Sequence, residues 1–496
     1  MKRLRPIMLG GTGSDVGKSL LVAGLCRIFL QDGYSPAPFK AQNMALNSYV
    51  TPDGLEIGRA QAVQAAAAGL ECMVEMNPVL LKPSGQKRAQ VIVNGRPAGD
   101  REASEYFNIR SQLPLKETAI KAFRTLSAGF NPIVMEGAGS VAEINLLDRD
   151  FVNMPMAEAA DAAVILVGDI NRGGVFAQIY GSIMLLPEHY RKRIKGVIIN
   201  KFRGDIDLFR EGRSMLENLC GVPVLGVVPF FHDIDIEEED SLSKEKYSRS
   251  AVKGEVVNVA VVDVPQMSNF TDFDFLSRDS RVHLYFSHEP EELEKADVIL
   301  LPGSKNTISD LRTICERGCD KVILDAPGRG VTVAGICGGY QMLGQSISDP
   351  YGVEGDISEV EGLGLLPVRT TLNRDKTLTR SSVRLPGEDK PLDGYEIHVG
   401  ATVLGEGCSS MFLREDGSGE GCRVSERVWG TYMHGILDNP RVVDMLLQPY
   451  LEARSLPLEC DRESLSHYRE RQYDMLADKL RECIDMQWLY KIMNYD

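Results

Sequence analysis

Short apolar runs alternate with longer helical patterns along the first 230 residues of the chain. The apolar runs predict β-strands at residues 6–10, 37–40, 132–136, 162–169, 195–200 and 222–228. The helical patterns between them cover residues 18–31, 56–68, 117–127, 174–185 and 208–219. Strands without polar alternation, separated by helices, are typical of a parallel sheet that is covered on both faces. We therefore predict a doubly wound α/β domain over residues 1–230.

The pattern breaks after residue 230 and then starts again. Six of the eight residues from 233 to 240 are acidic, which predicts a solvated linker over residues 231–253. A second α/β domain is expected over residues 254–445, with apolar strands at residues 256–264, 281–286, 297–301 and 331–336. Shorter runs at residues 363–369, 394–400 and 428–432 favour antiparallel strands, and residues 446–496 have the spacing of helices.

Composition and charge argue against several classes of function for this chain. The 496 residues are 43% hydrophobic and 25% charged, as in ordinary globular proteins. A formal net charge of −15 argues against nucleic acid or an anionic membrane as a partner. The chain has no apolar run of about 18 residues, so no membrane span is expected. Ten scattered cysteines without a Cys-x-x-Cys pair indicate a reducing cytoplasm and no zinc site.

A phosphate-binding loop follows the first predicted strand and precedes a predicted helix. Its residues are Gly11, Thr12, Gly13, Ser14, Asp15, Val16, Gly17, Lys18 and Ser19. Backbone N–H groups of such a loop surround phosphate oxygens, while Lys18 would bridge the β- and γ-phosphates of ATP and Ser19 would ligate Mg²⁺. Gly11 lies six positions before Gly17, so the loop is one residue longer than a standard Walker A motif.

This loop spacing resembles dethiobiotin synthetase and the cobalamin-pathway amidases, which use ATP to phosphorylate a carboxylate. An acid at the carboxyl end of a parallel strand is placed at the nucleotide crevice, and Glu136 follows an apolar strand. The resemblance implies that Glu136 is a Mg²⁺ ligand beside Ser19. Glu56 is our candidate for a further metal ligand, with Asp53 as a competitor. The alternative for both is an exposed acid at a helix N-terminus.

A candidate nucleophile lies at a second strand-to-helix junction. Cys337 stands between Gly335 and Gly339, and this spacing is the thiol counterpart of the Gly-x-Ser-x-Gly nucleophile elbow. The helix N-terminus favours the thiolate, and the N–H groups of Gly338 and Gly303 are candidates for an oxyanion hole. The alternative for a single cysteine is a small buried apolar side chain.

The thiol requires a base, and seven histidines are available. His434 lies at a predicted strand end with glycines on both sides, and it follows Cys337 at a distance that suits a class I glutaminase. His398 lies within a predicted strand and is the competing candidate. We predict that Cys337 and His434 hydrolyse L-glutamine to release ammonia.

Longer blocks then support a family resemblance over nearly the whole chain. They are residues 39–48, 56–61, 76–83, 168–176, 200–205 and 301–307. With these blocks the chain resembles the cobyric acid synthase family, which consists of glutamine-dependent amidotransferases of the cobalamin pathway. The resemblance implies a synthetase domain fused to a class I glutaminase domain. It also implies a corrinoid substrate, adenosylcobyrinic acid a,c-diamide, amidated at carboxylates b, d, e and g through acyl phosphates.

The resemblance has further implications and one departure. It suggests substrate contacts, with loop capping as the alternative, at Gln42, Asn43, Asn47, Asn77, Lys82 and Arg172. The anionic substrates require a basic site within the acidic chain, for which the candidates are Lys18, Lys40, Arg59, Lys82 and Arg172. Gly435 and Ile436 follow His434, whereas many class I glutaminases carry x-Glu there, so the group that orients the imidazole is missing from its usual place.

Two rival functions remain at this stage. Cobyrinic acid a,c-diamide synthase shares both chemistries but amidates two other carboxylates, and the blocks at residues 41–48 and 76–83 disfavour it. A P-loop switch ATPase that makes no product would have no functional thiol, so the elbow at Cys337 argues against it.

Overall fold

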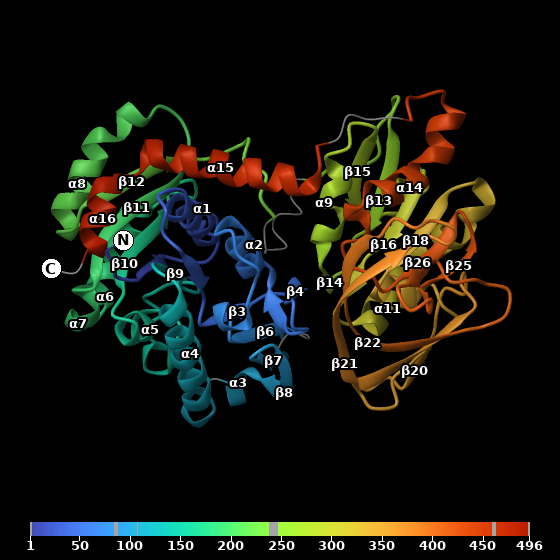
Figure 1. Cartoon of the computed structure of the whole chain (residues 1–496), viewed down its shortest axis with the longest axis horizontal. Helices are drawn as coiled ribbons and strands as arrows, with labels where there is room; N and C mark the ends of the chain where they lie inside the picture. The colour runs from blue at the N-terminus through green and yellow to red at the C-terminus, as the bar shows by residue number, and fades with distance from the viewer. Residues whose placement is uncertain (1, 84–87, 107, 238–246, 459–462, 495–496) are drawn as a thin grey trace.

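The computed structural model describes residues 2–83, 88–106, 108–237, 247–458 and 463–494. Figure 1 shows two lobes side by side, the first in blue and green and the second in yellow and orange. Helix α15 (Leu465–Cys483) returns from the second lobe and lies along the first. No helix in the described part of the chain combines the length and the apolar character that crossing a membrane requires.

The first domain is built on a six-stranded sheet in the order β12-β11-β10-β1-β9-β2, in which every pair of neighbours is parallel. The strands are β1 (Ile7–Gly11), β2 (Ala37–Phe39), β9 (Ile133–Glu136), β10 (Ala163–Asp169), β11 (Ile194–Phe202) and β12 (Val224–Pro229). The larger helices are α1 (Lys18–Gln31), α2 (Arg59–Ala67), α4 (Ile109–Gly129), α6 (Val175–Leu185) and α8 (Arg210–Cys220). The parallel α/β class predicted from the apolar runs is confirmed.

Two smaller sheets are inserted after β2. One has the order β3-β6-β7-β8, with β3 (Gln42–Met44), β6 (Val79–Pro83), β7 (Arg88–Val93) and β8 (Arg96–Glu102). The other is a hairpin of β4 (Ser48–Val50) and β5 (Glu56–Gly58) that contacts the second domain. The helix expected from residue 56 begins only at Arg59, because Glu56 pairs in β5 and Gly58 is extended with φ −60° and ψ 140°.

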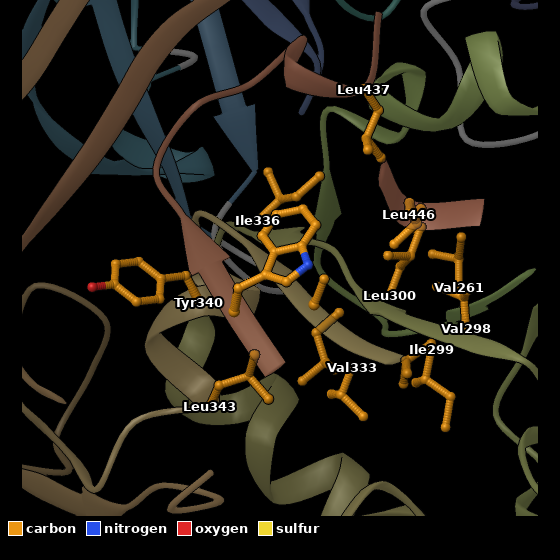
Figure 2. Close-up of a cluster of buried hydrophobic side chains, with 14 of the residues drawn as sticks. Val261, Val298, Ile299, Leu300, Val333, Ile336, Tyr340, Leu343, Leu437 and Leu446 are labelled. Atoms are coloured by element: carbon orange, nitrogen blue, oxygen red, sulfur yellow. The ribbon is translucent and has the colours of Figure 1, made fainter. Parts of the chain in front are cut away.

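The second domain contains a six-stranded sheet in the order β15-β13-β16-β18-β26-β25. Its strands are β13 (Val257–Val262), β15 (Val282–Ser287), β16 (Val298–Leu301), β18 (Thr332–Ile336), β25 (Cys422–Ser425) and β26 (Val428–Thr431). The apolar core of this domain is shown in Figure 2. The expectation of antiparallel pairing at residues 428–432 is wrong on one side, because β26 runs parallel to β18 and antiparallel only to the edge strand β25.

A long hairpin of the second domain extends toward the first. Strands β21 (Val368–Arg384) and β22 (Leu392–Leu404) pair antiparallel over most of their length, and both contact β4. Their register shifts between Leu372 and Thr377, where the ladder is interrupted. This hairpin brings side chains of the second domain to the phosphate-loop domain.

The described part of the acidic segment, residues 233–237, and the C-terminal helices pack more closely than the sequence indicated, while residues 238–246 of the predicted linker lie outside the described residues. The Glu237 side chain is only 7% exposed and pairs with Arg59 at 2.5 Å and with Arg469. The prediction of a solvated linker is therefore wrong at this residue, because two guanidinium groups neutralise its carboxylate. Helix α14 (Pro440–Ala453) packs in the second domain, whereas α15 and α16 (Met486–Met493) complete the core of the first.

Candidate active sites

The phosphate loop has the geometry that its glycines predict. Gly17 has φ 90° and immediately precedes α1, and a Cβ at this position would lie 2.2 Å from the Asn200 amide nitrogen. The Lys18 ammonium donates to the carbonyl oxygens of Gly13 (2.9 Å) and Gly139 (3.2 Å), so it lies across the loop. Phosphate oxygens of a bound triphosphate would therefore replace these two carbonyl oxygens as hydrogen-bond acceptors of the Lys18 ammonium.

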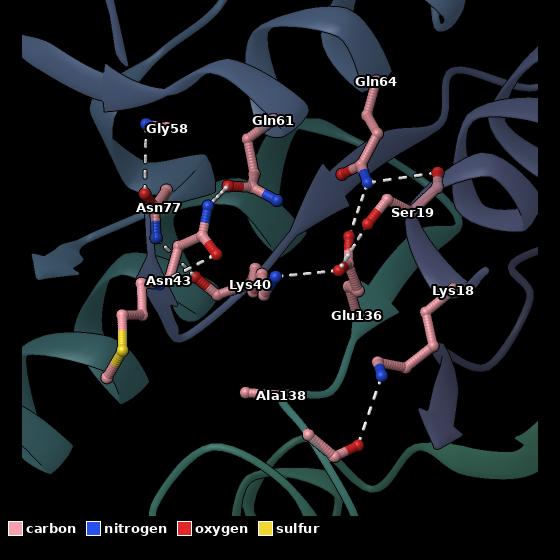
Figure 3. Close-up of polar contacts among 12 residues, drawn as sticks. Lys18, Ser19, Lys40, Asn43, Gly58, Gln61, Gln64, Asn77, Glu136 and Ala138 are labelled. Atoms are coloured by element: carbon pink, nitrogen blue, oxygen red, sulfur yellow. Dashed lines mark hydrogen bonds and ion pairs between the residues drawn. The ribbon is translucent and has the colours of Figure 1, made fainter. Parts of the chain in front are cut away.

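Ser19 and Glu136 form a possible metal-binding pair at the end of β9. The Ser19 hydroxyl donates to Glu136 Oε1 at 2.9 Å, and the Lys40 ammonium contacts the same oxygen at 2.8 Å (Figure 3). Burial alone would raise the pKa of Glu136, but Lys40 and the Gln64 amide lower it overall, so the carboxylate is ionised. An ionised carboxylate next to a hydroxyl suits Mg²⁺, which takes few protein oxygens when phosphates supply the rest.

Glu56 is not placed with Ser19 and Glu136. Its fully buried carboxylate accepts from Ser48 Oγ at 2.8 Å and forms ion pairs with Lys82 (3.0 Å) and Lys376 (2.5 Å). Two ammonium groups already neutralise this carboxylate, which corrects our expectation of a metal ligand here. The competing Asp53 is exposed and bonds to the Thr51 hydroxyl at 2.6 Å. No cluster of three or more acidic, His or Cys ligands occurs among the residues that the structure describes.

Four of the six predicted substrate contacts have uncharged polar side chains: Gln42, Asn43, Asn47 and Asn77. Asn77 donates to the carbonyl oxygens of Lys40 and Val79 and accepts from Gly58 N–H, which is the loop-capping alternative. Asn43 and Asn47 are buried near it, and Gln42 accepts from the Tyr106 hydroxyl.

The predicted basic residues do not form one patch. Lys82 lies with Glu56, whereas Arg172 is largely exposed and pairs with Asp15 of the phosphate loop at 3.5 Å. Arg59 pairs with Glu237 and lines a separate cavity of about 940 Å³ between the domains. Only Lys40 joins Lys18 beside Ser19 and Glu136.

Cys337 lies in a strained turn between β18 and α13 (Gly338–Met342). Its φ of 53° and ψ of −106° are unusual for a residue with a side chain. The flanking glycines are needed for packing, because a Cβ on Gly335 would lie 2.5 Å from the Gly339 backbone and one on Gly339 would lie 2.1 Å from the Leu301 carbonyl oxygen. The sharp turn therefore presents the sulfur at the end of the strand, as in a nucleophile elbow.

His434 is buried and is oriented by an aspartate that the sequence did not reveal. Its Nδ1 lies 2.7 Å from Asp272 Oδ2, and Asp272 Oδ1 accepts from Gly435 N–H at 2.9 Å. Burial alone would lower the pKa of His434, but Asp272 and the neighbouring Cys337 raise it to about 10. Asp272 thus supplies the carboxylate that is absent from the position after His434.

The remaining predicted residues of this site take different positions. A Cβ on Gly303 would lie 3.1 Å from His434 Cε1, and one on Gly338 would lie 2.7 Å from Ser304 N, so the two glycines flank the thiol site together. The Nδ1 atom of His398 instead lies 2.8 Å from the acceptor Gly400 O, its Nε2 atom lies 3.3 Å from the Glu396 carboxylate, and its ring stacks on the Tyr432 ring at 3.8 Å. These contacts engage both nitrogens of His398, which leaves His434 as the histidine paired with Cys337.

Comparison with known proteins agrees with both domains. Residues 7–243 match the family described as CobQ/CobB/MinD/ParA nucleotide binding domain, and residues 258–442 match the CobB/CobQ-like glutamine amidotransferase domain. The fold and the two sites thus define an enzyme of the glutamine amidotransferase class with an attached nucleotide-binding domain.

Relatives of full length identify the family. The chain is 55% identical to cobyric acid synthase of Phocaeicola vulgatus over 496 residues and 53% identical to that of Bacteroides fragilis over 494 residues, and each alignment covers 99% of both chains. Cobyric acid synthase of Streptococcus sanguinis is 46% identical over 499 residues, again with 99% of each chain. The chain belongs to the cobyric acid synthase family, the glutamine amidotransferases of cobalamin biosynthesis.

Proposed function

We propose that this chain amidates the b, d, e and g carboxylates of adenosylcobyrinic acid a,c-diamide, with ATP as the activating nucleotide and glutamine as the ammonia donor. The observation that carries the proposal is the presence in one chain of a phosphate loop and a Cys337–His434–Asp272 group. Neither site alone would serve this reaction, because one activates a carboxylate and the other releases the nitrogen that replaces its oxygen.

In the second domain, Cys337 is the nucleophile. The sulfur attacks the side-chain amide carbon of glutamine, and the protonated His434 donates a proton to the departing ammonia. The raised pKa of His434 keeps the imidazolium, which stabilises negative charge on the sulfur. The N–H groups of Gly303 and Gly338 serve as the oxyanion hole, and water then hydrolyses the γ-glutamyl thioester to glutamate.

In the first domain, Lys18 and the loop N–H groups bind the ATP phosphates and stabilise charge that develops on the γ-phosphoryl group. A corrinoid carboxylate attacks that group, ADP leaves, and ammonia displaces phosphate from the resulting acyl phosphate to form the amide. Ser19 and Glu136 are the residues that would hold Mg²⁺, which neutralises phosphate charge when bound.

The deciding experiment separates the two half-reactions. A Cys337→Ala variant is assayed for corrinoid amidation, once with glutamine and once with ammonium salts at alkaline pH. We expect glutamine-dependent amidation to disappear and ammonia-dependent amidation to persist. Loss of both in a folded variant would contradict a two-site enzyme. Mass spectrometry of the wild-type product distinguishes four added amides from the two that a cobyrinic acid a,c-diamide synthase would add.

A further inference from the structure

Two buried glutamine side chains of α2 each have one polar atom that forms no hydrogen bond with the residues that the structure describes. Gln61 and Gln64 are 0% and 1% exposed, and the atoms without a partner in that part of the chain are the donor Gln61 Nε2 and the acceptor Gln64 Oε1. Buried amide groups are nearly always satisfied in native proteins, by protein, water or ligand. A small ligand that accepts one hydrogen bond and donates another would satisfy both.

The orientation of both amides is fixed by their other contacts. Gln64 Nε2 donates to Glu136 Oε2 at 2.6 Å, so the reversed amide would place its oxygen against a carboxylate. Gln61 Oε1 accepts from Asn43 Nδ2 at 3.0 Å, so the reversed amide would oppose two NH₂ groups. The open donor and the open acceptor are therefore properties of this packing (Figure 3).

The position of the two amides points to their ligand. Residues three apart on a helix lie on one face, and this face of α2 is directed at Glu136 and Ser19 beside the phosphate loop. Ammonia has one lone pair that can accept from Gln61 Nε2 and three N–H groups, one of which can donate to Gln64 Oε1. We propose that Gln61 and Gln64 form a binding site for one molecule of ammonia next to the place where the acyl phosphate forms.

Buried polar contacts connect this site to the thiol site. Asp272, which orients His434, donates its N–H to Asn269 O at 3.0 Å, and the Asn269 side chain accepts from Ser48 N–H at 3.0 Å. Ser48 Oγ bonds to Glu56 in β5, and Gly58 at the end of β5 lies against Asn43 and Gln61. The β4–β5 hairpin thus spans the distance between the two sites.

An ion cluster occupies the middle of this connection. Glu56 is paired with Lys82 of its own domain and with Lys376, which the β21–β22 hairpin brings from the second domain. The ion pair between Glu56 and Lys376 thus joins the second domain to the hairpin that lies between the two sites.

This inference rests on the proposed function, and its test uses the ammonia-dependent reaction of the full chain. Gln61→Met keeps the volume of the side chain and removes the open donor. We expect the KM for ammonia to rise about threefold to tenfold, the effect of one lost hydrogen bond. The KM values for ATP and the corrinoid and the rate of glutamine hydrolysis should remain within twofold. Gln112→Met, which removes a buried glutamine that donates to Tyr106 O, is the matched control.

The outcomes separate the alternatives. An unchanged KM for ammonia would mean that water or nothing occupies the site, and a rise in the corrinoid KM alone would mean that the amides contact substrate; either result overturns the proposal. Should Gln61→Met fail to fold, Gln61→Glu keeps the acceptor for Asn43 and replaces the open N–H, and the same rise is expected. If the wild type showed no amidation with ammonia, the proposed function would fail instead, whatever the variants did.

Discussion

Asp272 is the residue whose role can be tested most sharply. It contacts His434 Nδ1 through Oδ2 at 2.7 Å and Gly435 N–H through Oδ1 at 2.9 Å. In an Asp272→Asn variant the amide oxygen can still accept from Gly435, and the NH₂ group then faces Nδ1. Nδ1 must become the acceptor, so the ring proton moves to Nε2 and the imidazole is neutral.

The expected size of the effect follows from the electrostatics. Raising the pKa of His434 from 6.5 to about 10 corresponds to about 5 kcal/mol in favour of the charged ring. A carboxylate about 4 Å from the centre of charge, at an effective dielectric constant of about 20, supplies about 4 kcal/mol. Asp272 is therefore the largest of the contributions that oppose the effect of burial, ahead of Cys337. A neutral imidazole is a much weaker acid than the imidazolium, so loss of the imidazolium as the proton donor should reduce the kcat of glutamine hydrolysis roughly 10²- to 10⁴-fold.

Glutamate release at saturating glutamine measures this prediction, and ammonia-dependent amidation should stay near the wild-type rate. Asp274→Asn is the matched control, since Asp274 is also buried in this turn but accepts from the Tyr247 hydroxyl. Wild-type glutaminase kinetics in Asp272→Asn would refute the assignment of Asp272 as the residue that orients His434. Equal losses of kcat in both variants would show that glutamine hydrolysis depends on the intact turn and not on the Asp272 carboxylate itself.

Three further predictions concern the phosphate loop, the domain junction and stability. Lys18→Ala should abolish ATP-dependent amidation and leave glutamate release measurable; retained amidation would remove the loop from the mechanism. Lys376→Met leaves Glu56 with one fewer cation, so chemical denaturation should show a free energy of unfolding lower by about 3 kcal/mol. More glutamate should also form per amide made; if both the unfolding free energy and this ratio were unchanged, Lys376 would have no role at the domain junction. Because the folded pKa of His434 is raised, its stabilisation is complete below pH 6.5 and is lost as the pH rises through about 10. The unfolding free energies of wild type and Asp272→Asn should therefore converge over that range, and a constant difference would contradict this linkage.

Local sequence patterns predicted those features whose cause is local. Helix α1 begins at Lys18 and ends at Gln31 as predicted, because the Gly-rich loop defines its start. The close approaches of Gly335 and Gly339 explain why the glycines around Cys337 signalled a sharp turn. The parallel sheet of the first domain also followed from uninterrupted apolar runs, since such strands are buried on both faces.

Features that depend on distant partners could not be predicted in this way. Asp272 lies 162 residues before His434, and no spacing rule connects them. Glu56 looked like the first acid of a helix because the lysine that neutralises it, Lys376, lies 320 residues away. Glu237 looked solvated for the same reason, since Arg59 and Arg469 approach it only in the folded chain. In each case the charged side chain can be buried only because it has a partner, and that partner lies far away in the sequence.

The contacts of the β4–β5 hairpin explain how one chain can combine the two sites. The Tyr49 ring packs on Tyr395 at 4.8 Å, and the Tyr395 ring stacks on His434 at 5.3 Å. The bond from Ser48 N–H to the Asn269 side chain and the Glu56–Lys376 ion pair cross the same boundary. A linker alone would leave the orientation of the two domains free, whereas these buried contacts join the hairpin to the residues around His434. A change in the phosphate-loop domain that moves the hairpin must therefore disturb the surroundings of His434.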